Sequence, residues 1–470
     1  MDILLTHGFF LSEDEKEQAI MKPYAPLGLL YLSSHLRERG FEVEIYDATF
    51  GSREELFQML RASSPSVLGI YSTLMTRPSV LNIVEVARAL GWTVVLGGPE
   101  PSVYPEQYLD AGAHLIIQGE AEDTLDEWLT ALRNTAGTSL HKIPGIIFRE
   151  PNGSVVRTPA RRLIADLDSQ PWPDRERIPI DKYLKAWRER HGIASLSLIT
   201  ARGCPFSCRW CSRSVFGTTH RRRSVKSVVD EVEWLMGKYR PDILWIADDV
   251  FTIQRRWILE YAHLMREKGL QVPFECITRA DRIDAQVSDA LADLHCFRVW
   301  IGCESGSQRV LNAMERGVTL DQVRNAFQLC HERGIKTGMF VMWGYEGEGL
   351  EDIEATIENV KNARPDLFLT VVSYPIKGTQ YYDQVATRLV SPRPWNESTD
   401  RDLVITGRGS KEFYSCADRL LKAEVALQKL TRDNEVDATR AGELHRQVET
   451  LRRELFAAQS KKVDFTPGIL

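Results

Sequence analysis

The chain has 470 residues, of which 43% are hydrophobic and 26% are charged. This composition is ordinary for a globular protein and excludes a disordered, fibrous or collagen-like chain, while the length suggests about three folded units. A net charge of −6 argues against broad, non-specific nucleic-acid binding. The chain has no apolar run of about 18 residues, and its start turns acidic where a secretion signal needs apolar residues. We therefore expect a cytoplasmic protein without a transmembrane segment.

The first 140 residues alternate short β-branched runs with helical patterns. The strand-like runs are FEVEIYDA, SVLGIYST, TVVLGG and HLIIQG. This alternation predicts an α/β fold whose first domain, residues 1–140, is a doubly wound, Rossmann-like parallel sheet. Ligands of such sheets bind beyond the carboxyl ends of the strands, so the turns at 47–49, 72–76, 97–100 and 119–120 are candidate binding elements.

Residues 141–192 are rich in proline and arginine, and they include a predicted hairpin at Asn152-Gly153. We interpret this segment as a structured connector. A second alternation then occupies residues 193–383, with six strand-like runs: SLSLITARG, ILWIADDVF, FECITRADRI, RVWIGCESG, KTGMFVMWG and LFLTVVSYP. Six strands separated by helices predict a (β/α)6-type partial TIM barrel, with its chemistry at the carboxyl ends of the strands.

Residues 384–470 are predicted to form a helical C-terminal region. Leu444, Val448, Leu451 and Leu455 recur at helical spacing on an otherwise charged segment. We expect this apolar stripe to pack on the barrel or on a partner helix, because a coiled coil would need more heptads.

The most informative motif is a cluster of three cysteines, Cys204, Cys208 and Cys211, directly after the first barrel strand. Three thiolates from one loop suit an iron-sulfur cluster or zinc. Three ligands on a four-iron cluster leave one iron open to a small molecule. The alternatives are a zinc site completed by His220 and a chance grouping of buried thiols. The other five cysteines are expected to be small buried apolar residues: Cys276, Cys296, Cys303, Cys330 and Cys416.

The Cys-x3-Cys-x2-Cys spacing after a first barrel strand resembles the radical S-adenosylmethionine enzymes, and the similarity extends over residues 195–383. It implies a 4Fe-4S cluster on Cys204, Cys208 and Cys211. It also implies S-adenosyl-L-methionine contacts by Asp248 and Asp249 in ILWIADDVFT, Arg279 in FECITRADRI and Glu304 in GCESGSQRVLNAMERGVT. The implied chemistry is cleavage of the cofactor to a 5′-deoxyadenosyl radical that abstracts hydrogen from the substrate.

The first domain resembles the cobalamin-binding domain of a large subfamily of these enzymes. Many cobalamin domains carry an Asp-x-His-x-x-Gly signature, but Asp47 is followed here by Ala48 and Thr49, so the cobalt-binding histidine is missing. We expect His35 and His114 to be surface or packing residues. The resemblance implies cobalamin contacts by two groups of residues: Ser72, Thr73, Leu74, Met75 and Thr76 under the corrin, and Gly97, Gly98 and Gly119 along the nucleotide tail.

These features predict a cobalamin-dependent radical enzyme that methylates an unactivated carbon, or phosphorus, of a small metabolite or lipid. It would need an external electron donor such as flavodoxin or ferredoxin. The main alternative is an oxidase or cyclase of the same subfamily without net methyl transfer. A methylthiotransferase should carry a second cysteine triad in its first domain, which this chain lacks. A non-catalytic iron-sulfur sensor or nucleic-acid binder would rely on Arg221, Arg222 and Arg223, which we expect to be solvated or near an anionic substrate.

Overall fold

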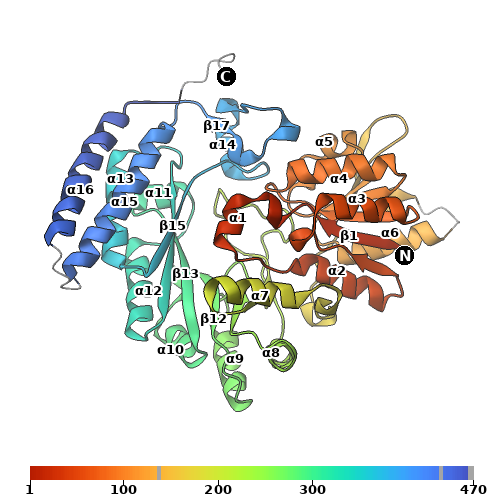
Figure 1. Ribbon diagram of the computed structural model, residues 1–470, viewed down its shortest axis with the longest axis horizontal. Coiled ribbons are helices and arrows are strands. Elements are labelled where there is room, and N and C mark those ends of the chain that lie inside the picture. The colour runs from red at the N-terminus through yellow and green to blue at the C-terminus, as the bar shows by residue number, and fades with distance from the viewer. Residues whose placement is uncertain (135–138, 433–437, 464–470) are drawn as a thin grey trace. The chain divides into compact units, whose positions relative to one another are not determined.

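The computed structural model describes residues 1–134, 139–432 and 438–463 (Figure 1). Contacts between Cα atoms divide the chain into two units. The first unit comprises Met1–Pro205, Ser212–Asp248 and Arg393–Thr399, and the second comprises Phe206–Cys211, Asp249–Pro392 and Asp400–Leu470. The division does not follow the order of the chain, because a short piece of the C-terminal region belongs to the first unit.

The N-terminal domain is built on a seven-stranded sheet with the order β2-β1-β3-β4-β5-β6-β7. Its first five strands pair in parallel. The strands are β1 Ile3–His7, β2 Val43–Ile45, β3 Val67–Tyr71, β4 Thr93–Gly97, β5 Leu115–Ile117, β6 Ile146–Arg149 and β7 Val155–Arg157. The predicted doubly wound sheet is confirmed, although the sequence pattern did not predict β1, which lies between β2 and β3.

Alternating side chains of the parallel strands enter two separate cores, one on each face of the sheet. Leu4, Leu68 and Leu96 belong to the core formed with α3, α4 and α5, whereas Leu5 and Val95 belong to the core formed with α2 and α6. Helices accordingly cover both faces (Figure 1). The helices are α1 Glu15–Ile20, α2 Leu27–Glu38, α3 Arg53–Ala62, α4 Arg77–Ala89, α5 Pro105–Asp110 and α6 Glu122–Arg133.

The segment expected to be a connector, 141–192, contributes to this sheet. β6 and β7 pair antiparallel through the predicted hairpin, in which Gly153 has a φ of +90°. β6 also pairs antiparallel with β5, so the sheet continues past residue 140 to Arg157. The helix α7, Ile180–His191, completes the segment.

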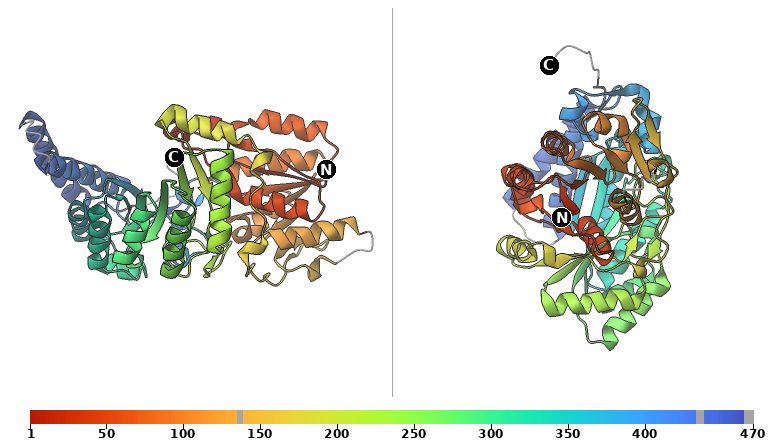
Figure 2. Two further views of the ribbon diagram at one scale, coloured as in Figure 1. Left: turned by 90° about the horizontal axis from the view of Figure 1, so that it is seen from below. Right: turned by 90° about the vertical axis from the view of Figure 1, so that its right-hand side faces the viewer.

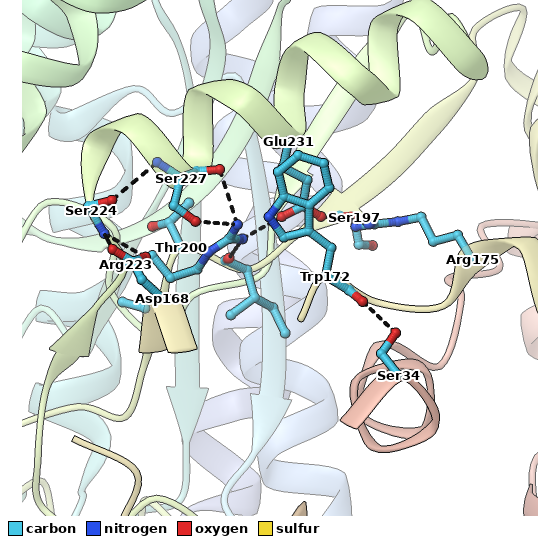
Figure 3. A network of polar contacts seen from close by, with 12 residues as sticks. Ser34, Asp168, Trp172, Arg175, Ser197, Thr200, Arg223, Ser224, Ser227 and Glu231 are labelled. Carbon is cyan, nitrogen blue, oxygen red and sulfur yellow. Dashed lines mark hydrogen bonds and ion pairs between the residues drawn. The ribbon is translucent and has the colours of Figure 1, made fainter. Parts of the chain in front are cut away.

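A buried ion-pair network binds the later part of the segment 141–192 to other elements of the first unit (Figure 3). Arg175 and Arg223 converge on Glu231 of α8 (Val225–Lys238), and all three side chains are at most 4% exposed. Arg175 Nη2 also donates to the carbonyl of Ser197 at 2.9 Å. Nearby, Ser34 on α2 donates to the carbonyl of Trp172 at 2.6 Å. Ion pairs and hydrogen bonds therefore join α2, the segment around Trp172, β8 (Ser195–Leu198) and α8.

The barrel strands form a parallel sheet with the order β15-β14-β13-β12-β11-β8, which confirms the predicted six strands. They are β8 Ser195–Leu198, β11 Ile243–Ile246, β12 Phe274–Arg279, β13 Cys296–Glu304, β14 Lys336–Trp343 and β15 Leu367–Val372. The helices along this segment are α8 Val225–Lys238, α9 Arg255–Glu267, α10 Ala285–Asp293, α11 Gln308–Ala313, α12 Leu320–Glu332 and α13 Leu350–Ala363. A short ribbon of β9 Ala201–Arg202 and β10 Arg221–Arg222 flanks the cysteine loop.

The C-terminal region contains α14 Gln380–Val385, the two-stranded ribbon of β16 Leu389–Val390 and β17 Val404–Ile405, and the long helices α15 Lys411–Arg432 and α16 Ala438–Ala458. The two long helices pack side by side in both figures (Figures 1 and 2). Val448, Leu451 and Leu455 are buried, so the predicted apolar stripe packs within the chain. No helix in the described part of the chain combines the length and apolar character that crossing a bilayer requires.

Candidate active site

The cysteine loop begins at a turn that only glycine can form. Gly203 has a φ of +85°, and a Cβ atom there would lie 2.5 Å from the carbonyl oxygen of Thr219. Cys204 is half-buried and belongs to the first unit, whereas the buried Cys208 and the exposed Cys211 belong to the second. Among residues 1–134, 139–432 and 438–463, no three His, Cys, Asp or Glu side chains are grouped to hold a metal. The cluster on these cysteines stays a prediction.

Two guanidinium groups lie against the sulfur of Cys208. Arg279 Nη1 is 3.8 Å and Arg316 Nη1 is 3.7 Å from the Sγ atom, and both arginines are buried. The Arg279 guanidinium also stacks on Phe206, 3.6 Å from the ring centroid. Positive charge here suits an anionic group such as a thiolate-bound iron-sulfur cluster or a carboxylate. The residues around Cys208 therefore fit the implied cofactors.

Arg316 is the functional candidate that sequence reasoning missed. It follows α11 within the stretch ERGVT, and its Nη2 atom donates to the carbonyl of Gly302 at 2.8 Å. Burial works to lower the pKa of Arg316, but Glu304 and Cys208 more than offset it and raise the pKa. Burial and the neighbouring Arg316 lower the pKa of Arg279. Its sequence signal is its place in the stretch GCESGSQRVLNAMERGVT, which also contains Glu304.

Glu304 ends β13 in a strained conformation. Its φ is +68°, a left-handed value that costs about 1–3 kcal/mol for such a residue, and the β13–β14 register shifts at this point. The side chain is nearly buried, and its nearest cation is Arg316, whose Nε lies 3.7 Å away. Burial raises the pKa of Glu304, opposed by Arg316 and Arg279. Strain and a desolvated carboxylate at the carboxyl end of a barrel strand are typical of a binding site.

Asp248 already has partners for both carboxylate oxygens. It accepts from the backbone N–H groups of Thr200 and Ala201 at 2.7 and 3.0 Å, from the Thr200 hydroxyl, and from Arg222 at 3.0 Å. These bonds fix the start of the cysteine loop relative to β11. The neighbouring Asp249 is exposed and belongs to the second unit. Contact of either residue with S-adenosylmethionine stays a prediction.

The three consecutive arginines are largely buried rather than solvated, and their nearness to an anionic substrate stays a prediction. Arg221 pairs with Glu120 at 2.7 Å, Arg222 pairs with Asp248, and Arg223 pairs with Glu231. Each guanidinium therefore has an acidic partner within the first unit. His220, the alternative zinc ligand, is partly buried, and burial followed by the charge of Arg222 lowers its pKa to about 4.

A cavity of about 270 Å³ lies at the carboxyl ends of β3, β4 and β5, and residues that follow β8, among them Arg202 and Phe216, complete its lining. The predicted residues Gly97, Gly98 and Gly119 line it, together with Tyr31 of α2, whereas Ser72, Thr73, Leu74, Met75 and Thr76 do not. A Cβ atom on Gly97 would meet no protein atom within 4 Å, so glycine there leaves open space for a ligand. Gly98 has a φ of +105°, and a Cβ atom would lie 2.3 Å from the Ser72 carbonyl oxygen.

Ion pairs form part of the cavity wall. Arg202 Nη1 lies 2.8 Å from carboxylate oxygens of both Glu120 and Glu122. The guanidinium of Arg202 also lies 5.2 Å from the Tyr31 ring centroid. Apart from these three charged residues and the aromatic Tyr31, Tyr71 and Phe216, the wall is largely aliphatic and glycine-rich, which suits a flat, mostly apolar ligand.

His7, His35 and His114 of this domain each make a hydrogen bond to another protein group. His35 is fully buried and bonded to Gln170, and His114 accepts a bond from the Val94 N–H, so neither lines the cavity, as expected. Asp47 lies 3.1 Å from His7 Nε2 and accepts from the Tyr183 hydroxyl at 2.6 Å. Burial works to raise the pKa of Asp47, but these bonds outweigh it and hold the pKa below its usual value.

Comparison with known protein families agrees with both parts of this description. Residues 20–129 match the B12 binding domain, and residues 198–360 match the radical SAM superfamily. The chain belongs to the cobalamin-dependent radical S-adenosylmethionine enzymes. The cofactors of this family are a 4Fe-4S cluster, S-adenosylmethionine and cobalamin, in agreement with the sequence-based prediction.

Individual relatives extend over both domains. An uncharacterized methyltransferase of Pyrococcus horikoshii is 29% identical over 81% of this chain and 83% of its own. The anaerobic magnesium-protoporphyrin IX monomethyl ester cyclase of Rubrivivax gelatinosus is 27% identical over 73% of this chain and 63% of its own. Among solved structures, the cobalamin-dependent S-adenosylmethionine radical enzyme OxsB superposes with a TM-score of 0.75, 17% identity, and coverage of 97% of this chain and 71% of OxsB. The last similarity concerns the fold alone.

Proposed function

We propose that this family member is a methyltransferase acting on an unactivated carbon, or on phosphorus, of a small metabolite or lipid. The observation that carries the proposal is the similarity to the Pyrococcus methyltransferase, which spans more than four-fifths of both chains and includes both domains. The cyclase similarity spans less than two-thirds of the cyclase, so the cyclase has a larger part without a counterpart here.

In the barrel, we assign Cys204, Cys208 and Cys211 to the cluster. Arg279, with Arg316 beside it, would bind the carboxylate of S-adenosylmethionine, and the pairing of both guanidinium groups with the Cys208 sulfur supports this role. Glu304 would accept hydrogen bonds from ribose hydroxyls. This role is supported because no described residue donates a hydrogen bond to its carboxylate. When bound, the cluster and S-adenosylmethionine supply a radical that abstracts hydrogen, and cobalamin supplies a methyl group.

The two aspartates would have different roles. Asp248 would keep the carboxyl end of β11 in register with the cysteine loop, because its oxygens are taken by Thr200, Ala201 and Arg222. Asp249 would approach the methionine end of S-adenosylmethionine, which its exposure supports.

In the N-terminal domain, the glycine-lined cavity would hold the nucleotide tail of cobalamin. The open space beside Gly97 supports this assignment. The turn from Ser72 to Thr76 would lie under the corrin, where no histidine of the Asp47 motif is present. The exposed Met75, with 51% of its surface accessible, gives that turn an apolar tip that a flat macrocycle would cover.

A second candidate function is oxidation or ring closure without net methyl transfer. The similarity to the Rubrivivax cyclase favours it, because that similarity also covers most of this chain. In both candidates the cysteine loop and barrel would do the same chemistry, and the difference lies in the use of cobalamin.

Product accounting separates the two functions. Protein reconstituted without oxygen, then supplied with cobalamin, a reductant and methyl-deuterated S-adenosylmethionine, should form both S-adenosylhomocysteine and 5′-deoxyadenosine, measured by mass spectrometry. Formation of 5′-deoxyadenosine alone would favour the oxidase or cyclase. If neither product forms, both functions are contradicted. The Cys208→Ala variant should lose 5′-deoxyadenosine, whereas Cys416→Ala, a control that removes another buried thiol, should retain it.

A further inference from the structure

The segment Arg393–Thr399 lies in the C-terminal part of the sequence but belongs to the first unit, with the N-terminal domain. Trp395 packs against the core of that domain. Its ring centroid is 5.6 Å from that of Tyr104 and 5.1 Å from that of Tyr108. The segments before and after it belong to the second unit.

Arg77 makes several contacts with this segment. It is 1% exposed, and its guanidinium lies 4.8 Å from the ring centroid of Trp395. Its Nη1 atom donates to the carbonyl of Ser398 at 2.9 Å, and its Nε atom donates to Glu100 at 2.5 Å. Arg77 is also the first residue of α4, where the helix dipole disfavours a cation. The buried charge is therefore held there by Glu100 and by the segment 393–399.

The network continues from Glu100 to the turn after β3. The Tyr108 hydroxyl donates to the second carboxylate oxygen of Glu100 at 2.7 Å, and it lies 3.1 Å from the hydroxyl of Ser72. Ser72, Tyr108, Glu100 and Arg77 are all at most 3% exposed. Arg77 also directly follows Thr76, so this one network reaches both ends of the turn from Ser72 to Thr76.

The turn has hydrogen bonds of its own and hydrogen bonds to the domain at its ends. The Thr73 N–H donates to the Thr76 hydroxyl at 3.0 Å, and the Thr76 N–H donates to the Thr73 carbonyl at 3.0 Å. The Ser72 N–H donates to the carbonyl of Gly97 at 2.8 Å. Bonds within the turn set its shape, whereas the Ser72 and Arg77 bonds set its place on the sheet edge.

We propose that the segment Arg393–Thr399 is a positioning element of the cobalamin site: Trp395 and Ser398 hold Arg77, and Arg77 holds the turn from Ser72 to Thr76 through Glu100 and Tyr108. The part of this inference that concerns cobalamin rests on the proposed function, which puts the turn under the corrin. The part that concerns the turn itself rests on the contacts alone. The C-terminal region thereby contributes to the N-terminal ligand site without touching the ligand.

The test compares Trp395→Ala with the control Trp234→Ala. Trp234 is another half-buried tryptophan of the first unit, and its ring centroid is 5.9 Å from that of Trp172, outside this network. Hydrogen exchange is measured for the backbone amides of residues 72–77 in the protein without cobalamin. Loss of the ring over Arg77 should speed their exchange about tenfold in Trp395→Ala, because opening the turn then breaks fewer contacts and costs less free energy. Trp234→Ala should exchange at the wild-type rate there, and Trp395→Phe should restore most of the protection.

A second measurement follows cobalamin binding by visible absorbance. Trp395→Ala and Arg77→Lys should bind cobalamin about tenfold more weakly than Trp234→Ala, and Arg77→Lys provides the answer if Trp395→Ala fails to fold. Wild-type exchange at residues 72–77 in both Trp395→Ala and Arg77→Lys would overturn the positioning role. If the wild-type protein binds no cobalamin, the proposed function fails, while the exchange result still decides whether the segment positions the turn.

Discussion

Arg316 shows how one side chain can connect several predicted site residues. Its guanidinium contacts the Cys208 sulfur and the Gly302 carbonyl, and its Nε atom lies 3.7 Å from the carboxylate of Glu304. Gly302 permits this approach, because a Cβ atom there would lie 2.5 Å from Arg316 Nη2. A single cation thus bridges the cysteine loop and the carboxyl end of β13.

We expect Arg316→Gln to lower the affinity for S-adenosylmethionine or the retention of iron by about 10- to 100-fold, as is usual when a group supporting metal ligands is removed. The loss should be larger than that of Arg316→Lys, which keeps the charge. Iron and sulfide content and equilibrium binding measure the effect. Arg333→Gln removes an arginine paired with Asp289 and serves as control. Wild-type iron content and affinity in Arg316→Gln would contradict the role.

Glu348 should make folding stability fall as pH rises. Burial raises its pKa to about 8, so the folded protein keeps the carboxyl protonated between pH 4.5 and about 8 while the unfolded chain loses the proton. Its contribution to stability is therefore complete at low pH and declines up to about pH 8, with a slope of at most about 1.4 kcal/mol per pH unit. Urea unfolding at pH 5, 7 and 9 should show Glu348→Gln gaining stability relative to wild type as pH rises.

The exposed Glu358 on α13 provides the comparison for this experiment. Glu358→Gln should follow the wild-type pH dependence. A constant difference between Glu348→Gln and wild type across the three pH values would show that Glu348 is ionised in the folded protein.

At the scale of elements, two consecutive glycines, one ending β4 and one beginning the turn after it, are needed for different reasons. Gly97 faces open cavity, whereas Gly98 has a left-handed φ and touches the Ser72 carbonyl. Gly97→Leu should therefore change the free energy of unfolding by less than about 0.5 kcal/mol and reduce cobalamin affinity at least about tenfold. Gly98→Ala should cost about 1–3 kcal/mol of stability. Thermal unfolding and a cobalamin titration measure both, and unchanged binding in Gly97→Leu would place the tail elsewhere.

At the scale of the whole molecule, the first unit depends on one buried carboxylate. Glu231 neutralises Arg175 and Arg223, which come from segments nearly 50 residues apart, and Arg175 also holds β8 (Figure 3). Glu231→Gln should cost about 3–5 kcal/mol of unfolding free energy, because two arginines would remain buried without a counter-charge. Denaturant unfolding measures it, and the exposed Glu233 on the same helix, changed to Gln, should cost little. A loss below 1 kcal/mol would show that water compensates the arginines.

Both domains and the cysteine motif were predictable because their signals are local. Alternation of apolar runs with helical patterns determines the doubly wound sheet and the six barrel strands, and Asn152-Gly153 determines a hairpin. The interior strand β1 was missed, because its apolar run stands alone at the start of the chain without a preceding helix to complete the alternation. Residues 141–192 were expected to connect domains, but β6 and β7 extend the sheet. The sequence pattern predicted the hairpin, but no local pattern specifies which strand a hairpin pairs with.

The amino-acid sequence by itself determined the family, the three cofactors and the residue types able to bind them, because ligand spacing and strand order are properties of the linear chain. Only the tertiary structure decided which charges meet. It gave each residue of the Arg221–Arg223 run an acidic partner, brought Arg316 to Cys208, engaged Asp248 with the backbone, and placed Trp395 over Arg77. Such pairs join residues up to about 320 positions apart, and no local pattern of hydrophobicity or spacing specifies a contact of that range.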